Sequence, residues 1–505
     1  MAIVLQVCFG KRGRVVGMHE AGTERPPPAP PAFQYNVPVT HAGGPRAPRI
    51  AGEGERHEGT AMQQAARTIG IGIIGLGTVG GGVARLIASH HDDYVRGYGI
   101  DLAVARACSR RAESADACGI DRARFTTDWR EVVADPAVDI VVELIGGEHP
   151  ATEIYEAAFA AGKHVVTANK ALLGRHVERL ARLAHDAGVQ IKCEAAAAGG
   201  IPVVNALEHN LVGNRILTIA GIMNGTTNYI LSRMATEGAG YDEVLADAQR
   251  LGYAEADPSA DVDGFDAASK TAILASIGFH TRVTTDDVFQ QGIRKISAED
   301  IAVAADLGYA IKLLGIARQT EAGVEARVHP TMIPAAHQLA AVSGAMNAVY
   351  VVGDAVGETM FYGAGAGSFP TASAVVGDIF SLAEPLSRGE QPLPEMEPYG
   401  AMTRVLPIEE LSNRFYVRLR ILDTVGALAP VVNAFSQAGI SISQINQLET
   451  EVDGACSVVF VTHEAGEAAM EGACRALEAL PGVREVANVI RIEDVDAWTE
   501  GAMAN

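Results

Sequence analysis

The chain has 505 residues, of which 48% are hydrophobic and 20% are charged, and its formal net charge at pH 7 is −21. This length predicts about three globular domains, and the negative charge disfavours nucleic acid and anionic membrane surfaces as partners. No apolar run approaches the ~18 residues that a membrane helix needs, so we expect no membrane association. The six cysteines are scattered without a CxxC pair. Such usage is typical of a reducing compartment, and we expect the protein in the cytoplasm.

The N-terminal stretch differs in kind from the rest of the chain. Residues 1–65 are rich in Pro, Gly and charge and have no hydrophobic period, so we predict a disordered extension. Met62 opens a more ordinary start, MQQAARTIGIGIIG. The upstream residues 1–61 are therefore compatible with a dispensable extension or with a mis-assigned start.

Strand and helix patterns alternate from Thr68 onward. The run TIGIGIIG is continuously apolar, as in a strand buried on both faces, and TVGGGVARLIASH follows with a helical pattern. Further strands are predicted at 101–109, 139–147, 163–170 and 189–195, and helices at 127–134, 151–161 and 171–187. The alternation predicts an α/β, doubly wound parallel sheet of the Rossmann type over residues 66–200. A later helix within about 365–385 is expected to complete this domain.

The alternation lapses after residue 200. An α+β second domain is predicted for 201–364, with strands at 215–225, 310–319, 324–333, 347–353 and 357–362 and helices around 227–238, 241–251 and from 264. Residues 386–412 contain a run of Pro, Gly and charge and are predicted to be a linker. Residues 413–495 follow the pattern βαββαβ, which predicts a small ferredoxin-like sandwich.

A glycine motif follows the first predicted strand directly and opens the first helix. It runs Gly75, Leu76, Gly77, Thr78, Val79, Gly80. In this position the glycines permit a tight turn and let backbone N–H groups approach a pyrophosphate at the positive end of the helix. A turn chosen only for close packing is the alternative. We therefore expect Gly75, Gly77, Thr78, Val79 and Gly80 to bind a dinucleotide.

The choice between NAD and NADP depends on the end of the second strand. Asp101 has the spacing of a ribose-binding carboxylate, but it lies at the start of that strand. The strand ends with Ser109, Arg110 and Arg111, and a hydroxyl with two guanidinium groups suits a 2′-phosphate. The sequence favours NADP, with NAD possible.

Residues 252–270, GYAEADPSADVDGFDAASK, concentrate carboxylates ahead of a lysine. A solvated acidic loop is the simple reading, but apolar residues interrupt the run, and Pro258 and Gly264 are turn residues. Asp266 and Lys270 stand four apart where a helical pattern begins, so they share one helix face. They are either a functional pair or only partners of each other.

Four segments in this order resemble homoserine dehydrogenase: VVTANK (165–170), EAAAAGGIP (194–202), GIMNGTTNYIL (221–231) and the acidic stretch. Residues 353–379 resemble the later cofactor-side segment of that family. The resemblance spans from about Ile69 to 385, and the C-terminal unit is similar to the ACT regulatory domain. In one departure Ala197 stands where valine is usual. This change is mild because the family uses the carbonyl of that residue.

The resemblance implies a monofunctional enzyme that reversibly reduces L-aspartate 4-semialdehyde to L-homoserine with NAD(P)H, in the biosynthesis of threonine, methionine and isoleucine. It implies that residues 201–364 bind substrate and dimerise, within a homodimer or homotetramer. Lys270 would be the proton donor and Lys170 a second active-site lysine. The substrate-binding carboxylates would be Glu255, Asp266 and Asp261. By contrast, Asp257 and Asp263 are expected in turns or caps.

The resemblance also implies further cofactor contacts and a metal site. The additional cofactor positions are Thr167, Lys170, Gly252 and Gly367. A structural sodium ion would be bound by Glu194 with the main-chain carbonyls of Ala197, Gly199 and Ile201. Oxygen ligands suit such a hard cation.

The C-terminal unit is expected to bind an amino-acid effector where its first strand turns into its first helix. The residues at this turn are Asp423, Gly426 and Ala427, with Asn433 further along the helix, and threonine is the expected inhibitor. A unit used only for dimer contacts is the alternative. If the unit is a sensor, removal of residues from 408 onward should leave an active enzyme that no longer responds to threonine.

Two rival functions remain at this point. Another amino-acid dehydrogenase, such as one acting on aspartate, would have to explain why a whole substrate domain resembles a different family. A catalytically dead nucleotide or amino-acid sensor would not need Lys170, Lys270, Glu255 and Asp266, all of which are present.

Overall fold

The computed structural model describes residues 67–392, 403–452 and 454–503. The predicted disordered extension (1–65) and residues 393–402 of the predicted linker lie outside the described residues. None of the helices that are described has the length and apolarity to cross a membrane.

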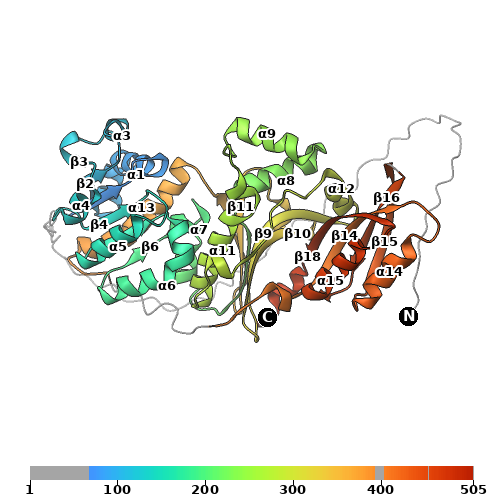
Figure 1. Cartoon of the computed structure of the whole chain (residues 1–505). Coiled ribbons are helices and arrows are strands. Elements are labelled where there is room, and N and C mark those ends of the chain that lie inside the picture. The colour runs from blue at the N-terminus through green and yellow to red at the C-terminus, as the bar shows by residue number, and fades with distance from the viewer. Residues whose placement is uncertain (1–66, 393–402, 453, 504–505) are drawn as a thin grey trace, which may run out of the picture. The chain divides into compact units, whose positions relative to one another are not determined.

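The first part of the chain forms the predicted Rossmann-type sheet (Figure 1). Its strand order is β3-β2-β1-β4-β5-β6, and the neighbouring strands are parallel. The strand order reverses beside β1, which is where dinucleotides bind in such sheets. The elements are β1 (Thr68–Ile74), α1 (Thr78–Ser89), α2 (His91–Tyr98), β2 (Asp101–Cys108), α3 (Glu113–Ala117), β3 (Phe125–Thr126), α4 (Trp129–Ala134), β4 (Ile140–Glu143), α5 (Ala151–Ala160), β5 (His164–Thr167), α6 (Lys170–Asp186) and β6 (Ile191–Lys192).

Strands β4, β5 and β6 of this sheet are shorter than predicted, and local contacts explain the early ends of β4 and β6. The strand β4 ends at Glu143 because the carboxylate of this residue accepts the N–H groups of Ile145 (2.7 Å) and Gly146 (3.1 Å), which closes a turn. The strand predicted at 189–195 has only two residues, since helix α7 (Glu194–Ala198) begins directly after it. The apolar pattern continues past the end of both strands, but a turn ends the first and a helix ends the second.

Helix α13 (Ser368–Ser387) packs against helix α1 of this domain. The Ser368 hydroxyl donates to the carbonyl of Thr78 at 2.6 Å. A Cβ on Gly82 would lie 2.9 Å from the Ala372 side chain. The glycine therefore allows α1 and α13 to pack closely.

The second domain has a mixed sheet in the order β12-β11-β7-β9-β10, with antiparallel neighbours along this path. Its elements are β7 (Ile216–Ile222), α8 (Gly225–Glu237), α9 (Tyr241–Leu251), α10 (Ser259–Val262), α11 (Phe265–Phe279), β8 (Phe289–Gln290), α12 (Ala298–Asp306), β9 (Tyr309–Gln319), β10 (Val324–Pro334), β11 (Met346–Gly353) and β12 (Gly357–Ala364). Helix α12 was not predicted. Its signal was a capping box, in which Ser297 and Asp300 bond each other's backbone N–H groups.

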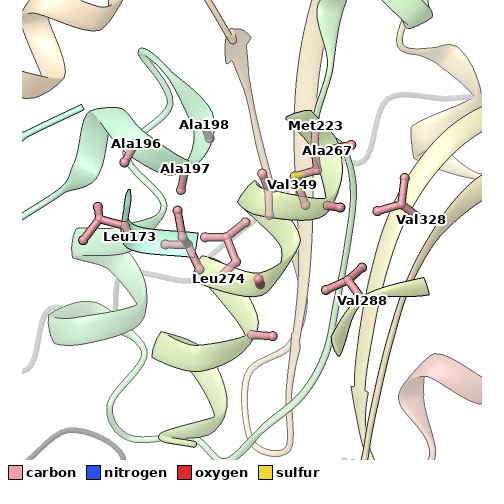
Figure 2. Close-up of a cluster of buried hydrophobic side chains, with 14 of the residues drawn as sticks. Leu173, Ala196, Ala197, Ala198, Met223, Ala267, Leu274, Val288, Val328 and Val349 are labelled. Carbon is pink, nitrogen blue, oxygen red and sulfur yellow. The ribbon is translucent and has the colours of Figure 1, made fainter. Parts of the chain in front are cut away.

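Helix α11 lies in the interior of the protein. It is apolar around most of its circumference, as in a helix packed on several sides. Figure 2 shows its residue Leu274 in one buried cluster with Leu173 of α6, Ala197 of α7, Val328 of β10 and Val349 of β11. Packing on these sides fixes the position of the polar residues that α11 carries.

The C-terminal tail (residues 412–492) has the predicted βαββαβ pattern. It comprises β14 (Ser412–Leu422), α14 (Leu428–Gln437), β15 (Ile442–Val452), β16 (Ala455–Thr462), α15 (Glu467–Glu478) and β18 (Val483–Ile492), after the short β13 (Val405–Leu406). The strand order β18-β14-β16-β15 is antiparallel, as in a ferredoxin-like sandwich. The β18 strand also pairs with β10 of the second domain at Thr331–Arg491 and Met332–Ile492 (Figure 1). One sheet therefore runs through both units.

Buried ion pairs stabilise the contact between the second domain and the C-terminal tail. Arg327 on β10 donates to Glu493 at 3.1 and 3.2 Å, and both residues are almost fully buried. Arg418 on β14 pairs with the fully buried Asp300 at 2.7 Å. Removing one partner of a buried pair costs about 3–5 kcal/mol, because the other charge stays buried. Removal of the chain from residue 408 onward would therefore take away these partners of Arg327 and Asp300 and lower the stability of the part that remains.

Candidate active site

The glycine motif forms the turn between β1 and α1. Gly75 donates its N–H to the carbonyl of Cys108 (2.9 Å) and has φ +107°, and a Cβ on Gly80 would lie 1.8 Å from the carbonyl oxygen of Gly75. Gly77 is the N-cap of α1 and has no side chain that could accept a hydrogen bond. The N–H groups of the first turn of α1 can therefore donate to a ligand. Thr78 and Val79 open this turn. The geometry fits a bound pyrophosphate.

The end of β2 presents the residues predicted to select the cofactor. Ser109 follows the strand, and Arg110 and Arg111 are exposed. Asp101 lies at the other end of β2, where it accepts from the Thr68 hydroxyl at 2.5 Å and contacts His91 at 3.0 Å. Asp101 is thus engaged away from the glycine turn, as the sequence indicated.

The polar centre of the site is Asp266 on α11. One of its oxygens accepts from Lys270 at 2.9 Å, and the other accepts from Lys170, the first residue of α6. Lys270 also donates to the carbonyl of Met223 at 2.8 Å, at the end of β7. Asn224 donates to Asp266 at 2.9 Å and to Asp261 at 2.7 Å. The structure thus brings together both predicted lysines and two of the three predicted carboxylates.

Burial and charge set the ionisation of this cluster. Asp266 and Lys270 are each 7% exposed. Burial opposes the charge on Asp266, but the neighbouring Lys270 and Lys170 outweigh it and hold the pKa of Asp266 below its usual range. Burial lowers the pKa of Lys270; Asp266 counteracts this shift, and the charge of Lys170 adds to it. The result is an ionised carboxylate beside a lysine that gives up its proton more readily than an ordinary one.

The other carboxylates of the acidic stretch have different surroundings. Asp257 accepts from the backbone and hydroxyl of Ser259, and Asp263 pairs with Arg294, so both stabilise the loop as expected. Glu255 is exposed, and among the described residues no lysine, arginine or histidine forms an ion pair with its carboxylate. It is the carboxylate of the set that stays accessible to a cationic group.

Two asparagines at the site were not singled out from the sequence. Asn224 caps α8 by accepting from Thr227 N–H at 2.9 Å while its amide nitrogen bridges two carboxylates. Asn347 is 1% exposed, neither of its amide atoms bonds another part of the described chain, and it lies against Gly225 and Gly365. Asn224 lies within the segment GIMNGTTNYIL, which could have pointed to it. Asn347 lies in no motif, so no feature of the sequence was a reason to select it.

Comparison with known proteins identifies the family. Residues 202–380 match the family model described as homoserine dehydrogenase, and residues 75–194 match the homoserine dehydrogenase NAD-binding domain. A homoserine dehydrogenase of Pseudomonas aeruginosa is 44% identical over 435 residues, covering 85% of this chain and 100% of the relative. One of Corynebacterium glutamicum is 44% identical over 430 residues, covering 84% and 96%. The chain belongs to the homoserine dehydrogenase family.

Solved structures agree with this assignment. The crystal structure of a homoserine dehydrogenase from Thiobacillus denitrificans has a TM-score of 0.79 and 43% identity, covering 85% of this chain and 99% of that one. A homoserine dehydrogenase of S. aureus has a TM-score of 0.67 and 34% identity, with the same coverage. The chain is an oxidoreductase with a Rossmann-type NAD-binding domain, as the resemblance implied.

The remaining cofactor positions implied by the homoserine dehydrogenase resemblance differ in their surroundings. Gly367 is the N-cap of α13, and Gly252 is the exposed C-cap of α9. The hydroxyl of Thr167 is buried in a network with Glu143 and Tyr155. A cofactor would therefore contact the main chain of Thr167 and not its side chain.

The carboxylate of Glu194 already has partners within the chain. It accepts the backbone N–H groups of Val203, Val204 and Asn205 at 2.7–2.9 Å, which caps the segment after the glycine pair. Ala197 lies in α7, Gly199 is its C-cap, and Ile201 follows. A sodium ion at this place would rely on main-chain oxygens.

The expected effector turn of this homoserine dehydrogenase family member lines a cavity. Asp423, Gly426 and Ala427 lie around a space of about 160 Å³ together with Gln447 and Cys456. Asn433 is exposed on α14 and is not part of this lining. Three of the four predicted effector residues are therefore grouped, and Asn433 is not.

Proposed function

We propose that this chain catalyses the NADP-dependent, reversible reduction of L-aspartate 4-semialdehyde to L-homoserine. The observation that carries the proposal is the contact of the buried Asp266 with both the buried Lys270 and the partly exposed Lys170, which joins the nucleotide-binding domain to the second domain. This arrangement places a readily deprotonated lysine and a second cation near a family-specific carboxylate loop.

The bound dinucleotide would supply the hydride for the carbonyl carbon of the substrate. Lys270 Nζ would donate a proton to the carbonyl oxygen as negative charge develops there, and in the reverse direction it would accept the hydroxyl proton. Asp266 holds Lys270 in place and favours its charged form. Lys170, whose side chain is 46% exposed, adds positive charge near the developing alkoxide.

The carboxylates of the acidic stretch would recognise the substrate ammonium. Glu255 is exposed and Asp261 is half-buried. An ammonium forms its strongest hydrogen bonds with carboxylates. Binding at Glu255 would explain why this carboxylate has no charged partner in the described chain.

The preference for NADP follows from the end of β2. Arg110 and Arg111 are exposed beside Ser109, where they can pair with a 2′-phosphate. A hyperthermophilic archaeal homoserine dehydrogenase mutant has been solved in complex with NADPH. It is 27% identical with a TM-score of 0.54, and the match covers 62% of this chain. NAD remains the alternative cofactor.

The proposal includes four finer points. The reaction would serve threonine, methionine and isoleucine biosynthesis in the cytoplasm. The tail would act as an ACT domain that binds threonine at the cavity lined by Asp423. A sodium ion would bind main-chain oxygens of Glu194, Ala197, Gly199 and Ile201. The assembly would be a homodimer or homotetramer formed through the second domain.

A comparison of substrates tests the proposed function. The purified chain should oxidise NADPH when aspartate 4-semialdehyde is added, and should reduce NADP with L-homoserine. Oxaloacetate with ammonia, the substrates expected of an aspartate dehydrogenase, should give no oxidation. Activity only with the second pair would replace the proposal, and no activity with either pair would favour a sensor.

A further inference from the structure

We propose that the C-terminal tail positions the catalytic helix α11 through residues 289–296, with Arg491 and Gln291 as the positioning residues. This segment, called here the strap, begins with β8 and lies between the last strand of the tail and the start of α11. The inference rests on the proposed roles of Lys270 and Asp266, and it adds a role for the tail that does not depend on an effector.

The tail holds one side of the strap. Arg491 of β18 donates to the side-chain oxygen of Gln291 at 2.9 Å, and its guanidinium lies 4.8 Å from the ring centre of Phe289. Glu467 fixes the orientation of Arg491 by accepting two bonds of 2.6 and 2.7 Å. Arg491 and Glu467 are each 8% exposed, so solvent screens this contact little.

A second tail residue holds the far end of the strap. Asn488, also on β18, donates to the carbonyl of Lys295 at 3.0 Å and to Asp300 at 2.9 Å. Asn488 is 3% exposed. Two side chains of the tail strand β18 therefore contact the strap, one near each of its ends.

The strap in turn supports the turn that begins α11. Ile293 donates its N–H to the carbonyl of Val262 at 2.8 Å. A Cβ on Gly292 would lie 2.2 Å from the same carbonyl oxygen and 2.5 Å from Cα of Asp263. The two backbones are therefore in direct contact, and only glycine fits at 292.

This turn sets the direction in which α11 leaves. Gly264 adopts φ +91° as the N-cap of α11, and a Cβ there would lie 3.3 Å from Val328 and 3.7 Å from the carbonyl oxygen of Gln291. Asp266 is the second residue of the helix, and Lys270 lies one turn further. A shift of the strap would therefore move the residue that orients the proton donor.

Arg294 of the strap also forms an ion pair with the acidic stretch, residues 252–270. It donates to both oxygens of Asp263 at 2.5 and 2.9 Å and to the hydroxyl of Ser259 at 3.1 Å. The strap is thus bonded to the tail on one side and to the substrate loop on the other. A change in the tail has a continuous contact route to the site.

The test compares two variants that each remove one hydrogen bond made by a side chain of the C-terminal part of the chain. Gln291→Leu removes the acceptor for Arg491, whereas Trp498→Phe removes the donor to Glu493 (3.0 Å), a contact that does not involve the strap. Gln291→Glu keeps an acceptor for Arg491 and serves as the conservative variant. The measurements are kcat and KM for semialdehyde reduction, and hydrogen exchange of the amides in residues 262–270.

Gln291→Leu is expected to lower kcat by roughly tenfold to a hundredfold, since misplacement of a catalytic group by about 1 Å has this effect. It should also speed exchange in residues 262–270, while KM for NADPH stays unchanged. Trp498→Phe should lower the melting temperature without either change, and Gln291→Glu should restore both readouts.

Equal kcat and equal exchange in Gln291→Leu and Trp498→Phe would overturn the positioning role. A Gln291→Glu protein as impaired as Gln291→Leu would also overturn it, because the bond to Arg491 would then not matter. If the wild-type chain does not reduce aspartate 4-semialdehyde, the proposed function fails. The exchange comparison still tests the inference in that case.

Discussion

Replacement of Lys270 by Met tests the assignment of the proton donor. The variant keeps a flexible side chain of similar length but cannot donate a proton. A positioned acid–base group contributes about 10²–10⁴-fold to a rate, which corresponds to about 3–5 kcal/mol of transition-state stabilisation. We therefore expect kcat for semialdehyde reduction to fall by this factor.

The contacts of Lys270 indicate that the fold should survive. Asp266 loses one partner but keeps Lys170 and Asn224 as donors. The carbonyl of Met223 loses a donor. The loss of such bonds costs about 1–3 kcal/mol, part of which is offset because a buried ammonium is removed.

Lys312 supplies a matched control for this experiment. It is 6% exposed, donates to Asn228 and to the carbonyl of Val342, and burial lowers its pKa to about 8. Lys312→Met should keep kcat. Between pH 8 and 10.5 the unfolded chain holds a proton at this lysine that the folded chain has released, so wild-type stability rises with pH there. The variant should lack this rise.

The assay is NADPH oxidation by purified, folded enzyme at saturating aspartate semialdehyde, with melting temperature and NADPH affinity as fold controls. The expected result is a large loss of kcat in Lys270→Met, with cofactor binding retained. Near-normal turnover in a folded Lys270→Met protein would refute the assignment. A similar loss in Lys312→Met would show that any buried lysine of this domain has the same effect.

Four further predictions follow from the structure. Arg110→Ala with Arg111→Ala should raise the KM for NADPH much more than that for NADH, and an equal effect on both would contradict the NADP preference. Because the pKa of Lys270 lies below its ordinary value of 10.5, this lysine loses its proton at a lower pH than an ordinary lysine. As the pH rises toward 10.5, the rate of reduction should therefore fall and the rate of homoserine oxidation should rise. If both rates change in the same direction with pH, one shared group does not act in both reactions. Deletion of residues 408 onward should give a protein with a clearly lower melting temperature, and an equally stable, active truncation would disprove the role of the buried ion pairs. Asp423→Ala should abolish any shift in melting temperature caused by millimolar threonine but keep kcat, whereas an unchanged shift would place the effector elsewhere.

The parts of the fold that could be predicted are those encoded by local patterns. The run TIGIGIIG and the glycine motif after it specify a buried strand and a tight turn within a few residues, and β1 and α1 form there. Asp266 and Lys270 were expected on one face of a helix because they stand four apart, and α11 confirms this. Spacing of this kind depends only on helix geometry.

Contacts between distant segments could not be predicted in the same way. Lys170 and Asp266 are 96 positions apart, and Arg327 and Glu493 are 166 apart. No local pattern records such pairings, since they depend on how the domains pack. For this reason the sequence indicated a tail behind a linker, whereas the structure shows β18 paired with β10.

The measurement that tests the central claim most directly is the identity and amount of product. Incubation of the purified chain with aspartate 4-semialdehyde and NADPH, followed by amino-acid analysis, should yield one molecule of L-homoserine for each NADPH oxidised. The Lys270→Met protein should form homoserine at a rate lower by about 10²–10⁴-fold. NADPH oxidation without homoserine, or homoserine formed equally fast by the Lys270→Met protein, would contradict the account.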